Sequence, residues 1–316
     1  MKKLSIIVPM YNEEEMIDLF FEKMNKTLSK ITNYTFEFVT VDDGSRDRTL
    51  ELLKKKKEEQ GNIHIVSFSR NFGHEAAVAA GFKYASGDVM IVMDADLQDP
   101  PEVIVQLIEK YEEGYEVVNA KRIDRMKDPF MKRFTAQAFY KLIAKLSGKI
   151  KVPENVGNYR LLDRKVVDEI NALSERNRVF RVEVPFVGYK TTDVGFVRAE
   201  RPKGKTHYNY KNMFKLAGDS ITSSSVAPLI WPFKWGIFVT LFNAIALLIN
   251  IILYYCQMND ITFLPSYPSL VLFIIIVPMF VLGIMMIILG IFGMYLSRIM
   301  VEAQDRPVYI VKEDIK

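Results

Sequence analysis

Two long uncharged stretches near the end of the chain limit its fold more than any other feature of the sequence. Residues 236–256 and 270–297 contain no Asp, Glu, Lys or Arg over about 21 and about 28 residues. As a helix, either stretch is long enough to cross a hydrocarbon core of about 30 Å. Core helices of soluble proteins rarely run so far without a charge. We therefore predict two membrane-spanning helices.

The charged residues around the two stretches predict their orientation. Lys234 comes before the first stretch, and the connecting segment 257–269 holds only Asp260 as a charge. Basic residues follow the second stretch at Arg298, Arg306 and Lys312. Because basic residues collect on the cytoplasmic side of membrane helices, we expect both termini in the cytoplasm. The helical pattern over 210–221 predicts an interfacial helix or, alternatively, an amphipathic helix packed on a soluble domain.

Upstream of about residue 225, short β-branched runs alternate with helical patterns. The strand patterns cover residues 4–8, 36–41, 63–68, 89–93 and 117–120. The helical patterns cover residues 13–30, 47–60, 75–85 and 101–111. Such alternation is typical of an α/β domain with a mainly parallel sheet and helices on both faces. Ligands of such sheets bind beyond the carboxyl ends of the strands.

Composition excludes some classes of function and location. The net charge of +4 is too small to indicate a nucleic-acid partner. The single cysteine, Cys256, cannot form a disulfide within the chain, which fits a reducing compartment. The apolar run Leu4 to Met10 is too short for a signal peptide, and polar residues follow it at once. We therefore expect a buried first strand and an N-terminal domain that stays in the cytosol.

Acidic residues follow two of the predicted strands, where such a sheet binds its ligands. Asp42-Asp43-Gly44-Ser45 follows the second strand, and Asp94-Ala95-Asp96 follows the fourth. Alternate carboxylates at a strand end can bind one hard cation that also takes diphosphate oxygens. Each motif alone has a simpler interpretation, namely a loop facing water or a turn with a helix cap. Their occurrence together favours a metal site.

Further motifs complete a pattern that resembles one family. In order along the chain they are residues 8–13 (VPMYNE), 42–45 (DDGS), 69–75 (SRNFGHE), 94–98 (DADLQ), 156–162 (VGNYRLL), 178–181 (RVFR) and 201–206 (RPKGKT). The chain resembles, over nearly its whole length, the polyisoprenyl-phosphate glycosyltransferases, relatives of dolichol-phosphate mannose synthase. Bacterial members with two C-terminal spans load glucose or N-acetylglucosamine onto undecaprenyl phosphate. The resemblance implies a GT-A-type α/β domain, juxtamembrane helices and two transmembrane helices.

The resemblance also implies roles for individual residues. The nucleoside would be held by Pro9, Tyr11, Glu13 and Asp42, with Asp43 close by. Asp94 and Ala95 would line the nucleotide-sugar site, and Asp96 and Gln98 would bind Mg²⁺ or Mn²⁺. The diphosphate would be faced by Arg122 and covered by a loop that carries Arg201 and Lys205. The implied catalytic set is Asp94, Asp96, Arg122 and Asn158. Simpler interpretations are packing for Tyr11 and a surface charge for Arg122.

One residue departs from the family pattern. Asn158 stands where the family usually has an Asp that has been proposed as a base or as a group orienting the acceptor. Asn cannot act as a base. A phosphate monoester has a second pKa of about 6, so the acceptor is largely ionised at neutral pH and needs no strong base. The alternative is that Asn158 marks a weakened or non-catalytic copy. For His74, an approach to substrate and a structural role are equally open.

We therefore predict a cytoplasmic GT-A domain over residues 1–205, a juxtamembrane region over 206–234, a two-helix anchor over 235–298 and a cytoplasmic tail over 299–316. The predicted reaction is an inverting transfer from a nucleotide-sugar, with UDP-glucose and UDP-N-acetylglucosamine as leading candidates, to polyprenyl (undecaprenyl) phosphate at the cell membrane. The product would serve the modification of cell-envelope glycans. Related enzymes suggest a homo-oligomer.

Two alternatives remain. A processive polysaccharide synthase shares the early acidic motifs, but this chain lacks the Gln-x-x-Arg-Trp motif of such enzymes and has too few spans for a channel. A non-catalytic membrane scaffold that keeps the nucleotide-sugar fold is favoured by Asn158. Retention of Asp94, Asp96 and Gln98 argues against a scaffold.

Overall fold

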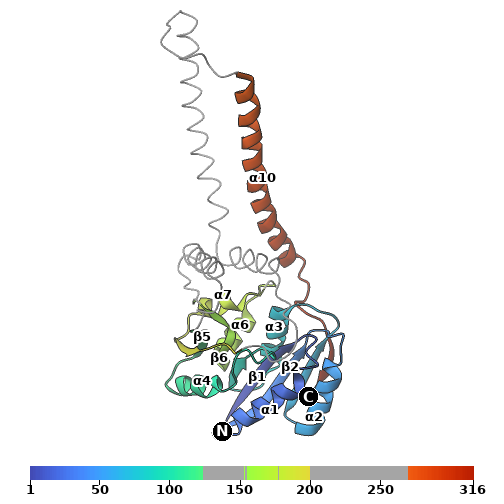
Figure 1. Ribbon diagram of the computed structural model, residues 1–316, viewed down its shortest axis with the longest axis vertical. Coiled ribbons are helices and arrows are strands. Elements are labelled where there is room, and N and C mark those ends of the chain that lie inside the picture. Colours follow the sequence, from blue (N-terminus) through green and yellow to red (C-terminus); the bar gives the residue numbers. More distant parts are fainter. Residues whose placement is uncertain (124–152, 154, 177, 200–269) are drawn as a thin grey trace, which may run out of the picture. The chain divides into compact units, whose positions relative to one another are not determined.

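The computed structural model describes residues 1–123, 153, 155–176, 178–199 and 270–316 (Figure 1). The chain divides into two compact units, Met1–Ser224 with Gln304–Lys316, and Ser225–Ala303. The predictions for Arg201, Lys205, the juxtamembrane region 206–234 and the first uncharged stretch concern residues outside the described part.

The described residues of the first unit contain an eight-stranded sheet in the order β7-β5-β6-β4-β1-β2-β3-β8. The strands are β1 (Lys2–Met10), β2 (Tyr34–Asp42), β3 (Ile63–Phe68), β4 (Val89–Val92), β5 (Val117–Arg122), β6 (Val156–Asp163), β7 (Thr191–Phe196) and β8 (Val311–Ile315). The pairs β1–β2, β1–β4, β2–β3 and β5–β7 are parallel. The pairs β4–β6, β5–β6 and β3–β8 are antiparallel. The predicted α/β fold with a mostly parallel sheet is confirmed.

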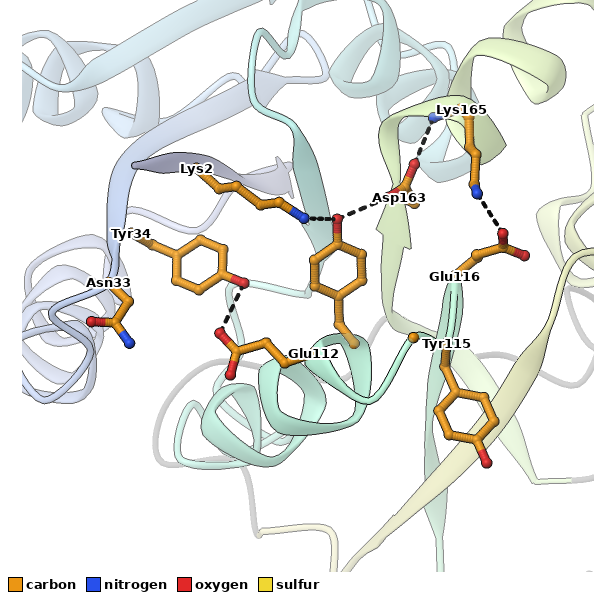
Figure 2. A pocket seen from close by; sticks show the side chains of 10 residues that line it. Lys2, Asn33, Tyr34, Glu112, Tyr115, Glu116, Asp163 and Lys165 are labelled. Carbon is orange, nitrogen blue, oxygen red and sulfur yellow. Dashed lines mark hydrogen bonds and ion pairs between the residues drawn. The ribbon is translucent and has the colours of Figure 1, made fainter.

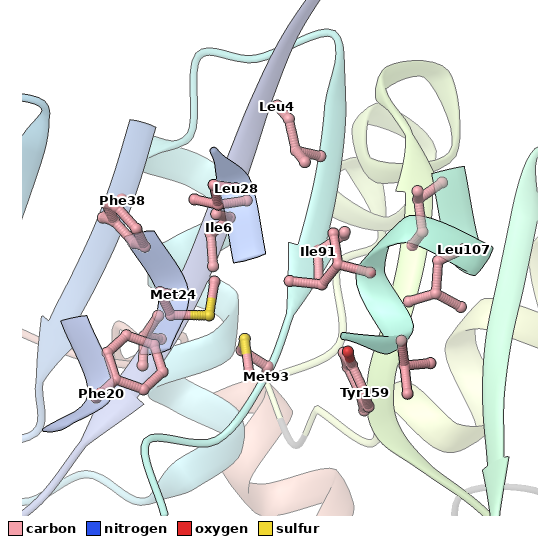
Figure 3. Packing of buried hydrophobic residues seen from close by; sticks show 14 of the residues in the cluster. Leu4, Ile6, Phe20, Met24, Leu28, Phe38, Ile91, Met93, Leu107 and Tyr159 are labelled. Atoms are coloured by element: carbon pink, nitrogen blue, oxygen red, sulfur yellow. The ribbon is translucent and has the colours of Figure 1, made fainter. Parts of the chain in front are cut away.

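Helices cover both faces of this sheet. They are α1 (Ile17–Leu28), α2 (Thr49–Gln60), α3 (His74–Tyr84), α4 (Val103–Glu112), α6 (Arg164–Ala172) and α7 (Phe180–Val187). Successive residues of a strand point to opposite faces, and β1 shows the result. Its Leu4 and Ile6 pack with α1 and α4, as Figure 3 shows, whereas Ile7 packs with α3, α6 and α7.

The order of the strands creates a place for a ligand. The chain runs from β1 through α1 to β2 and through α2 to β3 on one side, then returns through α3 to β4 on the other side of β1. Right-handed crossovers in opposite directions place their helices on opposite faces. The loops that leave β1 and β3 therefore lead to helices on opposite faces of the sheet, and they leave it at the carboxyl edge, which is where open α/β sheets bind ligands.

The predicted strands and helices up to residue 122 are all present, with ends shifted by a few residues. The largest shift is at the start of α1, which begins at Ile17 rather than at Glu13. The amides of Glu13 and Glu14 donate hydrogen bonds to Thr49 Oγ1 and Asp47 Oδ2, so these residues form a loop instead of a first helical turn. Strands β6, β7 and β8 were not predicted.

In the second unit, α10 (Leu270–Ala303) runs over 34 residues and includes Pro278. This helix contains the second uncharged stretch of the sequence. Among the described residues, no helix is found to combine the length and the apolar character needed to cross a membrane. The two membrane-spanning helices therefore stay a prediction.

Candidate active site

The loops that follow β1 and β2 are joined by hydrogen bonds at the carboxyl edge of the sheet. The amide of Asn12 donates to Ser45 Oγ at 3.0 Å, and the amide of Arg46 donates to Asn12 Oδ1 at 2.8 Å. Asn12 has a φ of 53°, a left-handed conformation that Asn tolerates better than most residues. Pro9 is buried in β1, whereas Tyr11 is half-buried beyond its end. This junction fixes the loop that carries Tyr11 and Glu13.

Asp42 and Asp43 are buried, with exposed fractions of 1% and 3%. Asp42 accepts hydrogen bonds from the Ser45 amide at 3.0 Å and from Ser67 Oγ at 2.8 Å. Asp43 accepts from the amides of Phe72 at 2.6 Å and Gly73 at 2.9 Å. Burial raises the pKa of Asp43, although those two amides act in the opposite direction. Both carboxylates organise the surrounding loops, and their contact with a nucleoside stays a prediction.

The segment after β4 makes a tight turn that presents its polar side chains on one side. Asp94, Asp96 and Gln98 are half-buried, whereas Ala95 and Leu97 between them are buried. The amide of Gln98 donates to Asp96 Oδ1 at 3.0 Å. Leu97 has a φ of 54°, which is costly for a leucine, and its burial in the core holds it there. Backbone strain of this kind collects at functional sites.

Two arginines meet a buried carboxylate beside this turn. Asp99 is 2% exposed, and its Oδ1 lies 3.5 Å from Arg122 Nη2 and 3.8 Å from Arg198 Nε. Burial raises the pKa of Asp99 to about 6, although Arg122 acts in the opposite direction. The amide of Ala199 donates to Gln98 O at 2.9 Å, so the chain that continues toward Arg201 leaves from this turn. Cationic groups therefore stand next to Asp94 and Asp96.

Asn158 lies on β6 and links the two sides of the site. Its Nδ2 donates to Glu75 Oε1 at 3.2 Å and lies 3.1 Å from His74 Nε2. Since Nδ2 is a donor only, His74 Nε2 acts as an acceptor in this contact. His74 Nε2 in turn lies 3.7 Å from Asp94 Oδ1. Asn158 Oδ1 is buried and has no partner among the described residues. Sequence motifs that are 84 residues apart thus meet at one point.

A buried arginine lies beneath Asn158 on the same face of β6. Arg160 is 2% exposed and donates to Gly157 O at 2.6 Å. Burial and, to a smaller extent, Arg181 lower its pKa to about 10, although Glu75 acts in the opposite direction. Glu75 therefore accepts a hydrogen bond from Asn158 and also acts electrostatically on the buried Arg160. The sequence pattern included Arg160 and Arg181 only as members of motifs, without a role.

The residues of this turn suit a hard divalent cation. Among the described residues, no group of three or more His, Cys, Asp or Glu side chains is arranged to hold a metal ion. The Asp96 carboxylate and the Gln98 amide oxygen are nevertheless hard oxygen donors, which Mg²⁺ and Mn²⁺ prefer. Mg²⁺ commonly takes only one or two protein carboxylates and completes its shell with phosphate oxygens and water. The donor set therefore fits an ion that binds together with a diphosphate.

Comparison with known proteins matches this fold and site to one family. Residues 5–171 match the model of glycosyl transferase family 2. The chain belongs to that family. The match spans β1 to β6 and therefore includes Asp42, Asp94, Asp96 and Asn158.

Relatives of this family 2 glycosyltransferase extend the match to the rest of the chain. It is 41% identical to an uncharacterised glycosyltransferase of Bacillus subtilis strain 168, over 98% of this chain and 93% of the relative. It is 40% identical to the bactoprenol glucosyl transferase of Shigella phage SfV, over 99% of both chains. The resemblance to polyisoprenyl-phosphate glycosyltransferases is confirmed. A solved structure of glucosyl-3-phosphoglycerate synthase from Mycobacterium tuberculosis aligns with a TM-score of 0.48 at 18% identity, over 70% of this chain and 78% of that one.

A pocket of this glycosyltransferase, separate from the candidate site, lies at the opposite edge of the sheet (Figure 2). It has a volume of about 510 Å³ and includes Lys2, at the amino end of β1, and Asp163, at the end of antiparallel β6. Its polar groups bond to one another: Tyr111 Oη accepts from Lys2 Nζ and donates to Asp163 Oδ2, each at 2.8 Å. The pocket contains none of the predicted site residues.

Proposed function

We propose that this chain is a membrane-anchored glycosyltransferase that moves a sugar from a nucleotide-sugar to the phosphate of polyprenyl phosphate. The observation that carries the proposal is the 40% identity to a bactoprenol glucosyl transferase over 99% of both chains. Because the similarity extends beyond the nucleotide-binding half, it concerns the acceptor as well as the donor. The names of such relatives favour UDP-glucose over UDP-N-acetylglucosamine as the donor.

The proposed cofactor is Mg²⁺ or Mn²⁺, held by Asp96 and Gln98. When bound, the ion would neutralise charge on the diphosphate as it leaves. Asp94 stands two residues before Asp96 on the same turn and would line the donor site. His74, the first residue of α3, lies beside it, with 3.7 Å between His74 Nε2 and Asp94 Oδ1. The sugar would therefore lie between the turn after β4 and the start of α3.

The reaction requires little proton transfer, which limits what the side chains must do. The phosphate oxygen of the acceptor is already ionised at neutral pH. It attacks the anomeric carbon while the bond from that carbon to the diphosphate oxygen breaks, and UDP leaves as an anion. Inversion at carbon follows from a single displacement. The remaining task is to hold two anions close together, and arginines are suited to it because their planar fork matches phosphate oxygens.

Arg122 and Arg198 are the described residues best placed for this task. Both lie within 4 Å of Asp99, a buried carboxylate that fixes their position next to the turn of Asp94 and Asp96. Burial lowers the pKa of Arg122, while Asp99 acts in the opposite direction, and arginine stays charged at neutral pH. Arg201 and Lys205 would add charge from the segment that follows Ala199.

We assign Asn158 an orienting role. Its Nδ2 is held by Glu75 and His74, so its position does not depend on the substrate. An aspartate in its place would set a second carboxylate beside that of Glu75, and the repulsion would raise the pKa of one of them. Asparagine avoids this repulsion, at the cost of any role as a base.

The membrane part of the proposal rests on the sequence. The uncharged stretches 236–256 and 270–297 would form a two-helix anchor, with the catalytic domain and both termini in the cytoplasm. A catalytic domain on that side would meet both soluble nucleotide-sugars and the phosphate of a membrane lipid. Assembly into a homo-oligomer is part of the same proposal.

The decisive experiment is an assay of the purified full chain with undecaprenyl phosphate and a panel of labelled nucleotide-sugars. Transfer of label to the lipid phase from one donor, lost in EDTA, supports the proposal. A non-catalytic scaffold, the alternative that Asn158 suggests, would bind nucleotide-sugar without turnover. Binding without transfer from any donor would therefore overturn the proposed function.

A further inference from the structure

The C-terminal segment forms the edge strand of the catalytic sheet. Strand β8 pairs antiparallel with β3, and the Ser69 amide donates to Ile310 O at 3.0 Å. Two side-chain contacts hold the strand, an ion pair of Lys54 with Glu313 at 2.5 Å and a hydrogen bond between His64 Nε2 and Asp314 Oδ1 at 2.6 Å. Figure 1 shows the C-terminus beside α2. Residues 307–316, here called the tail strand, thus belong to the same unit as the candidate site.

An aromatic stack connects the tail strand to the loop that follows β3. The ring of Tyr309 lies on Phe68, with centroids 4.9 Å apart and an angle of 11° between the planes. Phe68 meets Phe72 edge to face at 5.7 Å. Arg70 covers the outer face of Phe72, with Cζ 3.9 Å from the ring centroid. The stack ends on Phe72, in the loop of residues 69–73.

This loop holds the buried acidic residue at the end of β2. The amides of Phe72 and Gly73 are the donors to Asp43 described above. Gly44, with a φ of 65°, lies so close to the loop that an added Cβ would stand 2.4 Å from the carbonyl carbon of Arg70. The position of loop 69–73 therefore determines the position of residues 42–45.

We infer that the tail strand is a positioning element of the donor site, and that Tyr309 is its main contact. By stacking on Phe68, Tyr309 holds Phe72 and Gly73 in place, and these hold Asp43 and the loop that binds the nucleoside. The inference rests on the proposed function for the identity of the ligand. Covering the open edge of β3 is a simpler role for β8, and that role predicts an effect on stability without a selective effect on the donor.

Two variants of Tyr309 and one control separate these roles in the full chain. Tyr309→Ala removes the stack, and Tyr309→Phe keeps it. Ile310→Ala is the matched control, because Ile310 neighbours Tyr309 and its side chain is 52% exposed. Steady-state kinetics with UDP-glucose and undecaprenyl phosphate give the KM for each substrate. Hydrogen exchange by mass spectrometry reports the amides of residues 69–73.

Tyr309→Ala should raise the KM for the nucleotide-sugar about fivefold, the scale of one aromatic pair, and leave the KM for the lipid within about twofold. Exchange in residues 69–73 should become faster, and Tyr309→Phe and Ile310→Ala should behave as the wild type. Unchanged exchange in residues 69–73, or equal losses toward both substrates, would overturn the inference. If the wild type transfers no sugar, the proposed function fails, and the exchange result alone decides whether Tyr309 holds the loop.

Discussion

At the scale of single residues, Asp96 gives the clearest test of the metal proposal. Asp96→Asn removes one charge from the proposed ligands and leaves the diphosphate uncompensated, so transfer should fall below detection. EDTA should have the same effect on the wild type, and added Mn²⁺ or Mg²⁺ should reverse it. The measurement is transfer of labelled sugar to lipid. Asp168→Asn, an exposed change on α6, serves as the control. Full activity in EDTA would contradict the metal assignment.

Asn158 gives a prediction of the opposite kind, a small effect at a central position. Asn158→Asp should change the rate by less than about tenfold, which corresponds to about 1.4 kcal/mol, because the acceptor needs no base. The pH profile should follow ionisation of the acceptor phosphate near pH 6. Arg122→Gln should cost about a hundredfold or more, as the loss of one preorganised charge typically does. An inert wild type that Asn158→Asp restores by several orders of magnitude would show instead that a base is required.

The sequence allowed some of this site to be predicted and not the rest. Asp94 and Asp96 are predicted from a local pattern, alternate carboxylates after a buried strand, and Gln98 only from the resemblance to the family. The pairing of Asp99 with Arg122 and Arg198 could not, since it joins three segments by tertiary contacts alone. The hydrogen bonds from two backbone amides to Asp43 could not be predicted either. Every residue except proline has a backbone amide, so the residue types do not show which amides face Asp43.

At the scale of elements, Glu37 of β2 joins three segments at the amino edge of the sheet. It accepts hydrogen bonds from Ser5 on β1, and from both the amide and the hydroxyl of Ser86, just before β4. Lys3 forms an ion pair with it at 2.5 Å. Burial alone would raise its pKa, but these partners lower the pKa to about 2. Glu37 therefore stabilises the fold in its ionised form.

This shift predicts how stability depends on pH. Since the folded-state pKa lies below the ordinary glutamate value of 4.5, the contribution of Glu37 is complete above about pH 4.5 and is lost as pH falls toward 2. The loss should approach about 3 kcal/mol. Urea unfolding of the full chain, followed by far-UV circular dichroism between pH 2 and 6, measures it. Glu37→Gln should flatten this part of the profile, whereas Glu22→Gln, at an exposed position of α1, should leave it unchanged.

The strands differ in how well their own residues predict them. Parallel strands β1 to β5 are buried β-branched runs between helices, and their sequence predicted them. β6 places Gly157, Asn158 and Arg160 within eight residues, and β8 is a short charged segment, so neither resembles a core strand. Their strand conformation comes from pairing with β4, β5 and β3, up to 250 residues away in the sequence.

At the scale of the whole molecule, the proposed two-span anchor predicts on which side of the membrane each segment lies. A reporter fused after Lys316 and a reporter inserted near Asp260 should lie on opposite sides of the membrane, because one span separates them. Alkaline phosphatase and green fluorescent protein fusions report the two sides. A reporter inserted near Asn33, in the loop before β2, provides the cytoplasmic reference. Reporters at 260 and 316 on the same side would refute the anchor.

Strand β8 also has a consequence for synthesis. The ribosome makes a chain from its amino end, so β1 to β7 are complete long before residues 311–315 exist. Until then, the edge of β3 lacks its partner, and the ring of Phe68 lacks Tyr309. Everything between Phe196 and Val311, α10 included, has to be translated first. The sheet of the nascent chain therefore keeps an open edge at β3, and β8 can pair with that edge only after the whole of the second unit has been translated.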